Sequence, residues 1–149
     1  MRARRTVALT ALVAVAVVVA DQATKAIVRG SIGPFESVTV IPGVVHLINT
    51  ENSGVAFSVF SGGGALVVIV AVVALAALLA FFLTHLHRRL VWLPTGMLLG
   101  GAAGNLIDRV RLGGVTDWIK LPHWPAFNFA DVCITLGVVA LIYVLERVR

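Results

Sequence analysis

The feature that most constrains this chain is a run of 19 residues without a charged side chain, from Ala65 to Leu83. A helix of about 20 apolar residues matches the thickness of the hydrocarbon core of a bilayer. Hydrophobic residues make up 59% of the chain and charged residues 13%, whereas about a quarter of the residues of a soluble domain are charged. The sequence therefore predicts a membrane protein and excludes a water-soluble globule.

The hydrophobic pattern predicts four transmembrane helices in one domain that spans the 149 residues. We expect them at about residues 6–28, 65–83, 90–107 and 130–145. A signal peptide is an alternative interpretation of the N-terminus, because arginines precede a short apolar core and a small-residue cleavage site at Ala20. Apolar sequence resumes after Asp21, however, and this favours a spanning helix.

The segment 30–64 has a different character, since glycine and proline interrupt it repeatedly. Its β-branched runs at 38–41 and 44–48 lie on either side of Pro42-Gly43, a pattern typical of two short strands joined by a turn. We expect a mainly α membrane protein with a small extracytoplasmic β-sheet at the membrane surface.

Basic residues cluster at the ends of the apolar runs, which accounts for the net charge of +5 without a nucleic-acid partner. Four spans place both termini on one side, with seven Lys and Arg residues there and five on the other side. Because cytoplasmic loops carry the excess of positive charge, this bias favours cytoplasmic termini.

Three predicted helices carry a polar residue at a similar depth. Asp21 and Asn105 each lie 16 residues beyond the arginines that precede their helices, and Asp131 lies 15 residues before Glu146. At 1.5 Å per residue, these positions are roughly 22–24 Å from the terminal face. The shared depth predicts a polar site near the outer margin of the bilayer.

The spacing of these residues allows structural as well as functional roles. Asn105, Asp108 and Arg109 lie within one helical turn and share a face. Asp108 and Arg109 could form an interfacial ion pair, and Asp21 could pair with Lys25 at position i+4.

The outer loops leave similar alternatives. Asn128 is a candidate helix N-cap, and Asp131 would then be favoured by the helix dipole. Asp117 falls in a predicted loop, where a single aspartate is commonly solvated. The histidines lack the spacing of a zinc site and the serines lack the context of a nucleophile, so we expect neither a metal nor a cofactor.

The polar residues lie in five blocks whose types and order resemble the lipoprotein signal peptidase family, also called signal peptidase II. The resemblance covers nearly the whole chain. The blocks are DQATK at 21–25, ENSGVAFS at 51–58, GGAAGNLIDR at 100–109, VTDW at 115–118 and FNFAD at 127–131.

This resemblance implies an intramembrane aspartic endopeptidase in which Asp117 and Asp131 are the catalytic pair. It implies a prolipoprotein substrate that carries diacylglycerol on a cysteine, with cleavage immediately before that cysteine. Further residues are expected to support the pair or to contact substrate: Asp21, Lys25, Asn52, Gly54, Asn105, Asp108, Arg109, Asn128 and Ala130. Since Asp131 lies nearer a helix N-terminus, we expect it to carry the negative charge and Asp117 the proton.

The same resemblance implies a monomer in the bacterial cytoplasmic membrane, with its active site at the extracytoplasmic face and membrane lipid around it. Segment 30–64 would clamp the signal peptide, with Asn52 binding its backbone and Gly54 supplying a tight turn. Two other classes remain open, a small proton-coupled membrane transporter and a four-helix assembly subunit. A transporter predicts acids near the midplane of the bilayer, whereas these lie toward one face.

Overall fold

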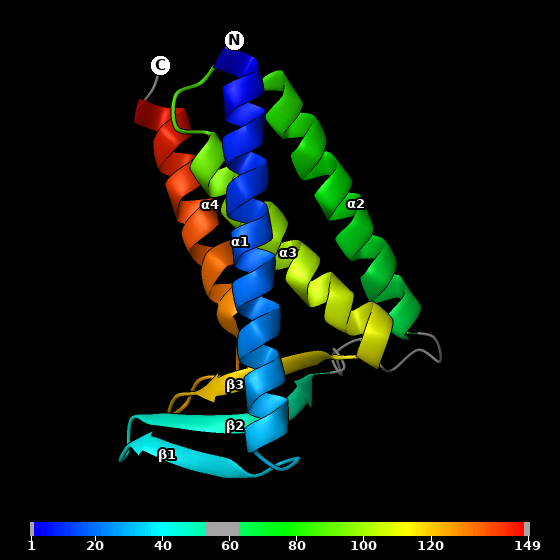
Figure 1. Ribbon diagram of the computed structural model, residues 1–149, viewed down its shortest axis with the longest axis vertical. Coiled ribbons are helices and arrows are strands. Elements are labelled where there is room, and N and C mark those ends of the chain that lie inside the picture. The colour runs from blue at the N-terminus through cyan, green and yellow to red at the C-terminus, as the bar shows by residue number, and fades with distance from the viewer. Residues whose placement is uncertain (1, 53–62, 148–149) are drawn as a thin grey trace.

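Four helices and three strands make up the computed structural model, which describes residues 2–52 and 63–147 (Figure 1). The helices are α1 (Arg2–Ser31), α2 (Gly63–Thr84), α3 (Trp92–Leu112) and α4 (Phe129–Arg147). Both ends of the chain lie at one end of the bundle, and the strands lie at the other (Figure 1). The four predicted helices are therefore present.

Three of these helices, α1, α2 and α4, are long and apolar enough to cross a membrane. α3 is not among them, because its second half carries Asn105, Asp108, Arg109 and Arg111. α3 nevertheless packs between α1 and α4 in the bundle. It begins two residues later than expected and continues five residues beyond the predicted end at 107. α1 runs without a break past Ala20, the candidate cleavage position.

Glycines on α3 allow its close packing against both neighbours. A Cβ atom at Gly100 would lie 2.7 Å from the Ala14 carbonyl oxygen of α1. A Cβ atom at Gly101, on the next position, would lie 2.6 Å from the Ala130 carbonyl oxygen of α4. Small residues let membrane helices approach to backbone contact, so α3 forms the centre of the bundle.

The strands form one antiparallel sheet in the order β1 (Ser37–Ile41), β2 (Val45–Asn52) and β3 (Val115–Lys120). The two predicted strands are confirmed, and the turn between them has Gly43 at φ 72°, a conformation that glycine adopts readily.

The prediction that Asp117 lies in a loop was wrong, because Asp117 lies on β3. The segment 115–120 pairs with β2 along nearly its whole length, and Asp117 faces Thr50 in the register. Its β-branched and aromatic residues favour a strand. This third strand fixes the height of Asp117 relative to the helices.

Candidate active site

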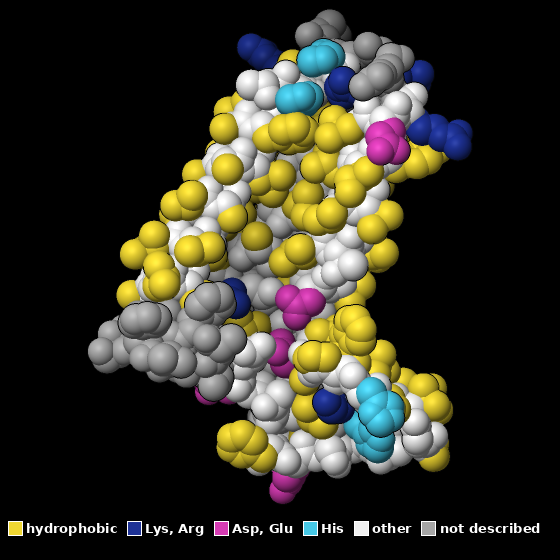
Figure 2. Space-filling view, turned by 180° about the vertical axis from the view of Figure 1, so that it is seen from behind, with side chains coloured by type: hydrophobic (Ala, Val, Ile, Leu, Met, Phe, Trp, Pro, Cys, Tyr) yellow, Lys and Arg dark blue, Asp and Glu magenta, His cyan; other side chains and the backbone are white. Residues whose placement is uncertain are grey.

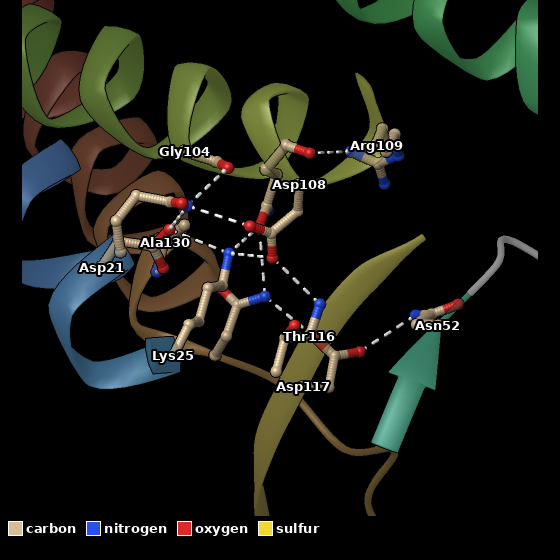
Figure 3. Close-up of polar contacts among 12 residues, drawn as sticks. Asp21, Lys25, Asn52, Gly104, Asp108, Arg109, Thr116, Asp117 and Ala130 are labelled. Carbon is tan, nitrogen blue, oxygen red and sulfur yellow. Dashed lines mark hydrogen bonds and ion pairs between the residues drawn. The ribbon is translucent and has the colours of Figure 1, made fainter. Parts of the chain in front are cut away.

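A buried lysine at the sheet end of α1 binds two carboxylates and an amide (Figure 3). Lys25 Nζ lies 2.8 Å from Asp21 Oδ2 and 3.1 Å from Asp108 Oδ2, and all three side chains are 0–1% exposed. It also donates to Asn105 Oδ1 at 3.0 Å. The ammonium group therefore has a partner for each of its three protons. The expected pairing of Asp21 with Lys25 is confirmed.

Backbone donors tie this ion cluster to the elements that surround it. The N–H of Ala130, in the first turn of α4, donates to Asp21 Oδ1 at 3.0 Å. The N–H of Thr116, on β3, donates to Asp108 Oδ2 at 3.0 Å. Since Asp21 and Asp108 belong to α1 and α3, the cluster joins three helices and the sheet.

Gly104 on α3 makes room for the carboxylate of Asp21. A Cβ atom at this position would lie 2.5 Å from Asp21 Oδ2. Gln22 bridges the same contact, because its Nε2 donates to the Gly104 carbonyl at 3.2 Å and to Asp108 Oδ1 at 3.0 Å. Sequence analysis did not single out Gln22, although it lies within the first of the five blocks.

The ion-pair partner of Asp108 is Lys25, not Arg109. Successive residues on a helix point in different directions, and Arg109 Nη1 instead contacts the Asn105 carbonyl at 3.4 Å. Another unanticipated bond joins Arg29 Nη1 of α1 to Thr116 Oγ1 of β3 at 2.8 Å. It holds the end of α1 against the strand that carries Asp117.

Asp117 and Asp131 form a second group of carboxylates, joined through asparagine. Asn128 Nδ2 donates to Asp117 Oδ1 at 2.8 Å, and the Asn128 N–H donates to Asp131 Oδ2 at 3.2 Å. Asn52 Nδ2 donates to Asp117 Oδ2 at 3.1 Å, and Asn105 Nδ2 donates to Asp131 Oδ1 at 2.8 Å. Each carboxylate thus accepts two hydrogen bonds, and Asn128 contacts both.

The position of Asn52 follows from the register of the sheet. Because Asp117 faces Thr50, Asn52 is its diagonal neighbour on the same face of the sheet and comes within reach. Gly54, the other candidate in this stretch, lies outside the described residues.

Asn128 also caps α4, as predicted from its position before the helix. Its Oδ1 accepts from the Asp131 N–H at 3.0 Å, while Asp131 Oδ2 accepts from the Asn128 N–H at 3.2 Å. This reciprocal pair has the geometry of a capping box. Asp131 is therefore held rigidly by the start of its own helix.

Burial raises the pKa of Asp117 to about 6. The charge of Asp131 acts in the same direction, whereas the hydrogen bonds from Asn52 and Asn128 oppose the shift. Asp117 is 2% exposed, so water offers its ionised form little stabilisation. With its pKa raised to about 6, the Asp117 carboxyl group keeps its proton to a higher pH than a solvated aspartate does.

An apolar pocket of about 340 Å³ adjoins Asp131. Its other lining residues come from the end of β3, the following loop and α4: Leu121, Trp124, Phe127, Val132, Thr135 and Leu136. In the space-filling view, acidic side chains are visible in a hollow where the helices meet the sheet, bordered by hydrophobic side chains (Figure 2). The pocket offers a carboxylate beside an apolar surface.

Metal ligation has no candidate in residues 2–52 and 63–147, where no group of three or more His, Cys, Asp and Glu side chains is placed to hold an ion. The described site holds two carboxyl groups, Asp117 and Asp131, that hydrogen-bond to the same asparagine, Asn128. Such a pair can act as general base and general acid on one substrate.

Comparison with known proteins gives one consistent result. The family model for signal peptidase (SPase) II matches residues 13–146. The lipoprotein signal peptidase of Halothermothrix orenii is 37% identical over 131 residues, which cover 88% of this chain and 90% of the relative. That of Dehalococcoides mccartyi strain 195 is 41% identical over 135 residues, which cover 84% of this chain and 81% of the relative.

A solved structure described as a bacterial membrane enzyme, determined by the in meso method at 1.9 Å, has a similar fold. It superposes with a TM-score of 0.86 at 34% identity and covers 93% of this chain and 92% of its own. None of these proteins supports the transporter interpretation.

Proposed function

The chain belongs to the signal peptidase II family and is a bacterial membrane peptidase, and from this premise we propose that Asp117 and Asp131 are its catalytic pair. The observation that carries the assignment is the bridge through Asn128, whose side chain contacts Asp117 and whose N–H contacts Asp131. No lysine or arginine in the described chain forms an ion pair with either carboxylate. Asp21 and Asp108, by contrast, are both paired with Lys25.

Asp117 carries the shared proton in this proposal, and Asp131 carries the charge. The raised pKa of Asp117 supports this order. The position of Asp131 in the first turn of α4 supports it as well, because the N-terminus of a helix favours a negative charge.

In the proposed reaction, Asp131 removes a proton from water, whose oxygen attacks the carbonyl carbon of the scissile bond. Asp117 gives its proton to the carbonyl oxygen, which yields a neutral tetrahedral intermediate. When the C–N bond breaks, Asp131 protonates the leaving nitrogen and Asp117 recovers a proton from a hydroxyl group. Both carboxyl groups end in their starting states, so the cycle consumes only water and peptide.

The substrate that fits this site is a prolipoprotein cleaved before a cysteine that carries diacylglycerol. The relatives are lipoprotein signal peptidases, and the pocket beside Asp131 is mainly apolar, with Thr135 as its other polar residue. Acyl chains could remain on apolar surface while the peptide bond reaches the acids. Asn52 and the β1–β2 hairpin lie on the sheet side, where they would hold the extended signal peptide.

The remaining candidate residues position the pair in this proposal. Lys25 and Asn105 orient Asp131, since Asn105 accepts from the ammonium and donates to the carboxylate. Asp21 anchors the Ala130 N–H, and Asp108 anchors the strand that carries Asp117 through Thr116. Among the candidates that the structure describes, Arg109 contacts the Asn105 carbonyl and no carboxylate.

We further infer that the chain acts as a monomer with cytoplasmic termini and its site at the extracytoplasmic face. The site lies at the end of the bundle opposite the termini (Figure 1). The arginines near the termini support this orientation, since basic residues favour the cytoplasmic side.

The test uses purified protein and a synthetic prolipoprotein with and without its diacylglyceryl group. We expect cleavage only of the lipidated peptide, and Asp131→Asn should lower its rate by at least about 10³-fold. Glu36→Gln, which changes an exposed acid of the sheet end, is the matched control and should cleave normally. Near-normal cleavage by folded Asp131→Asn would disprove the assignment of the pair.

A further inference from the structure

A second pocket, of about 300 Å³, lies at the terminal end of the bundle, far from the carboxylates. Its basic lining comes from two separate parts of the chain, Arg5 on α1 and His87, Arg88 and Arg89 in the connection between α2 and α3. Trp92 at the start of α3 completes one wall. Neither the family assignment nor the proposed reaction gives this pocket a role.

The charged residues that line this pocket are all basic. No aspartate or glutamate is among the residues that line it, and both ion pairs in the described chain involve Lys25 at the opposite end. Arg88 Nη1 donates to the Leu145 carbonyl at 3.2 Å, which fixes that side chain against the end of α4. Arg5 and Arg89 are exposed. Three guanidinium groups around one cavity make a site for an oxyanion, since guanidinium matches phosphate geometry.

The apolar residues around the pocket favour a phosphate ligand that also carries acyl chains. Leu9, Leu86 and Leu90 line it beside the arginines. An adjoining pocket shares Leu86 and His87 and continues over Ala3, Leu83 and Thr84. The basic cavity thus opens onto the ends of membrane-length helices, at the level where lipid head groups meet the acyl region. A tryptophan at this level is typical of a membrane interface.

We propose that this pocket binds the phosphate of an anionic phospholipid head group. Arg5 and Arg89 bind the phosphate oxygens, Arg88 supports them from its anchored position, and the leucines contact the start of the acyl chains. The lipid joins the start of α1 to the α2–α3 connection, two segments that are far apart in the sequence. This site is independent of the proposed reaction, because it lies at the other end of the helices.

The experiment measures lipid binding to the full chain in a neutral detergent. Phosphatidylglycerol and phosphatidylcholine with the same acyl chains are titrated separately, and binding is followed by native mass spectrometry. Arg5 and Arg89 are proposed to contact the phosphate directly through charge-assisted hydrogen bonds, which diffuse surface attraction does not provide. The double variant Arg5→Gln/Arg89→Gln should therefore bind phosphatidylglycerol at least about tenfold more weakly.

The matched control is Arg4→Gln/Arg147→Gln, which removes the same charge at the same end from residues outside the pocket. It should change phosphatidylglycerol binding by less than about threefold. An equal loss in both double variants would show diffuse attraction by the whole terminal face and would overturn the site.

Two further outcomes overturn the proposal. Equal binding of phosphatidylcholine by the unmodified chain would mean that the anionic head group is not recognised. Competition by glycerol phosphate at the same concentration as the lipid would assign the pocket to a soluble phosphate. Cleavage of the lipidated peptide serves as a folding check, and neither double variant should lose it, since none of these residues contacts the carboxylates.

Discussion

Asp21 and Asp108 lie on one side of the site and Asp117 and Asp131 on the other, and Asn105 separates the two pairs. All four carboxylates accept hydrogen bonds, but only the first two contact a cation, the buried Lys25. Asp117 and Asp131 receive only amide donors. Asp117 is as buried as Asp21 and Asp108, whereas Asp131 is half-buried beside its pocket. The ammonium group of Lys25 is the main difference between the two sides.

The difference shows how one small volume can hold four acids with two kinds of role. The two carboxylates that contact Lys25 form a buried ion cluster that joins α1 to α3. A carboxylate held by amides alone, next to another carboxylate, keeps a proton available near neutral pH. The ion cluster of Lys25, Asp21 and Asp108 holds the helices in place. Asp117 and Asp131 are the proposed catalytic residues.

The most direct test of the two roles is to remove one carboxylate from each side in separate variants. Asp117→Asn should lower cleavage of the lipidated peptide by about 10³-fold or more, because it removes the proposed acid. Asp108→Asn, at an equally buried position, should retain far more activity per folded molecule. Rates normalised to folded protein provide the measurement, and greater residual activity in Asp117→Asn would reverse the two roles.

Removal of the cation tests the structural side. Lys25→Met leaves Asp21 and Asp108 buried without a counter-charge, so the free energy of unfolding should fall by about 3–5 kcal/mol. Unfolding of detergent-solubilised protein measures the loss. Addition of Asp21→Asn and Asp108→Asn to the same chain should recover much of it. A Lys25→Met variant as stable as the parent would show that the ion cluster does not hold the helices.

The pH dependence of stability distinguishes the two sides as well. The folded chain keeps the Asp117 proton up to a pKa of about 6, whereas an unfolded aspartate loses it near 3.9. The contribution of Asp117 to the free energy of unfolding is therefore greatest at low pH. It falls as the pH rises from the unfolded pKa to the folded pKa. Asp117→Asn cannot ionise and should be more stable than the parent at pH 7.5, by on the order of 1–3 kcal/mol.

The same variant should show little gain at pH 4, where the parent carboxyl group is protonated in the folded chain. Thermal unfolding at the two pH values makes the comparison. An equal gain at both would mean that packing, not ionisation, explains the effect.

The smallest expected effect on cleavage comes from removing the side-chain amide of Asn52. Asn52 donates to Asp117 and favours its charged form, so Asn52→Ala should raise the pKa of Asp117 further. Because the reaction needs the protonated acid, the alkaline fall in cleavage rate should move to higher pH, with a rate loss of about tenfold. The control is Asn49→Ala, on the same strand, whose Nδ2 donates to the Ile32 carbonyl at 2.8 Å. A shift in both variants would attribute the effect to the sheet.

Most of the helical architecture could be predicted from sequence, because apolar length alone identifies a spanning segment. The depth of Asp21, Asn105 and Asp131 predicted that separate helices bring polar groups together, and their contacts with Lys25 and Asn128 confirm it. The cap at Asn128 was also predictable, since it depends on neighbours within one turn.

Contacts that depend on strand pairing could not be predicted. The bond from Asn52 to Asp117 needs β3 and its register with β2, and a register irregularity between Leu47 and Thr50 helps to set that register. The alternation in Val115-Thr116-Asp117-Trp118 offered a strand signal, but a single acid in a short segment favoured a loop. The Lys25–Asp108 pair could not be predicted for a similar reason, because it depends on how α1 packs against α3.

The ammonium of Lys25 also gives the asparagine network a fixed direction. Asn105 must turn its oxygen toward Nζ, so its nitrogen must face Asp131. Asn128 then has only donors to offer to Asn105 and Asp117, and its own oxygen is left for the Asp131 N–H. Neither amide can rotate by half a turn without placing N–H against N–H. One buried cation thereby dictates the orientation of the two amides, Asn105 and Asn128, that hold Asp117 and Asp131.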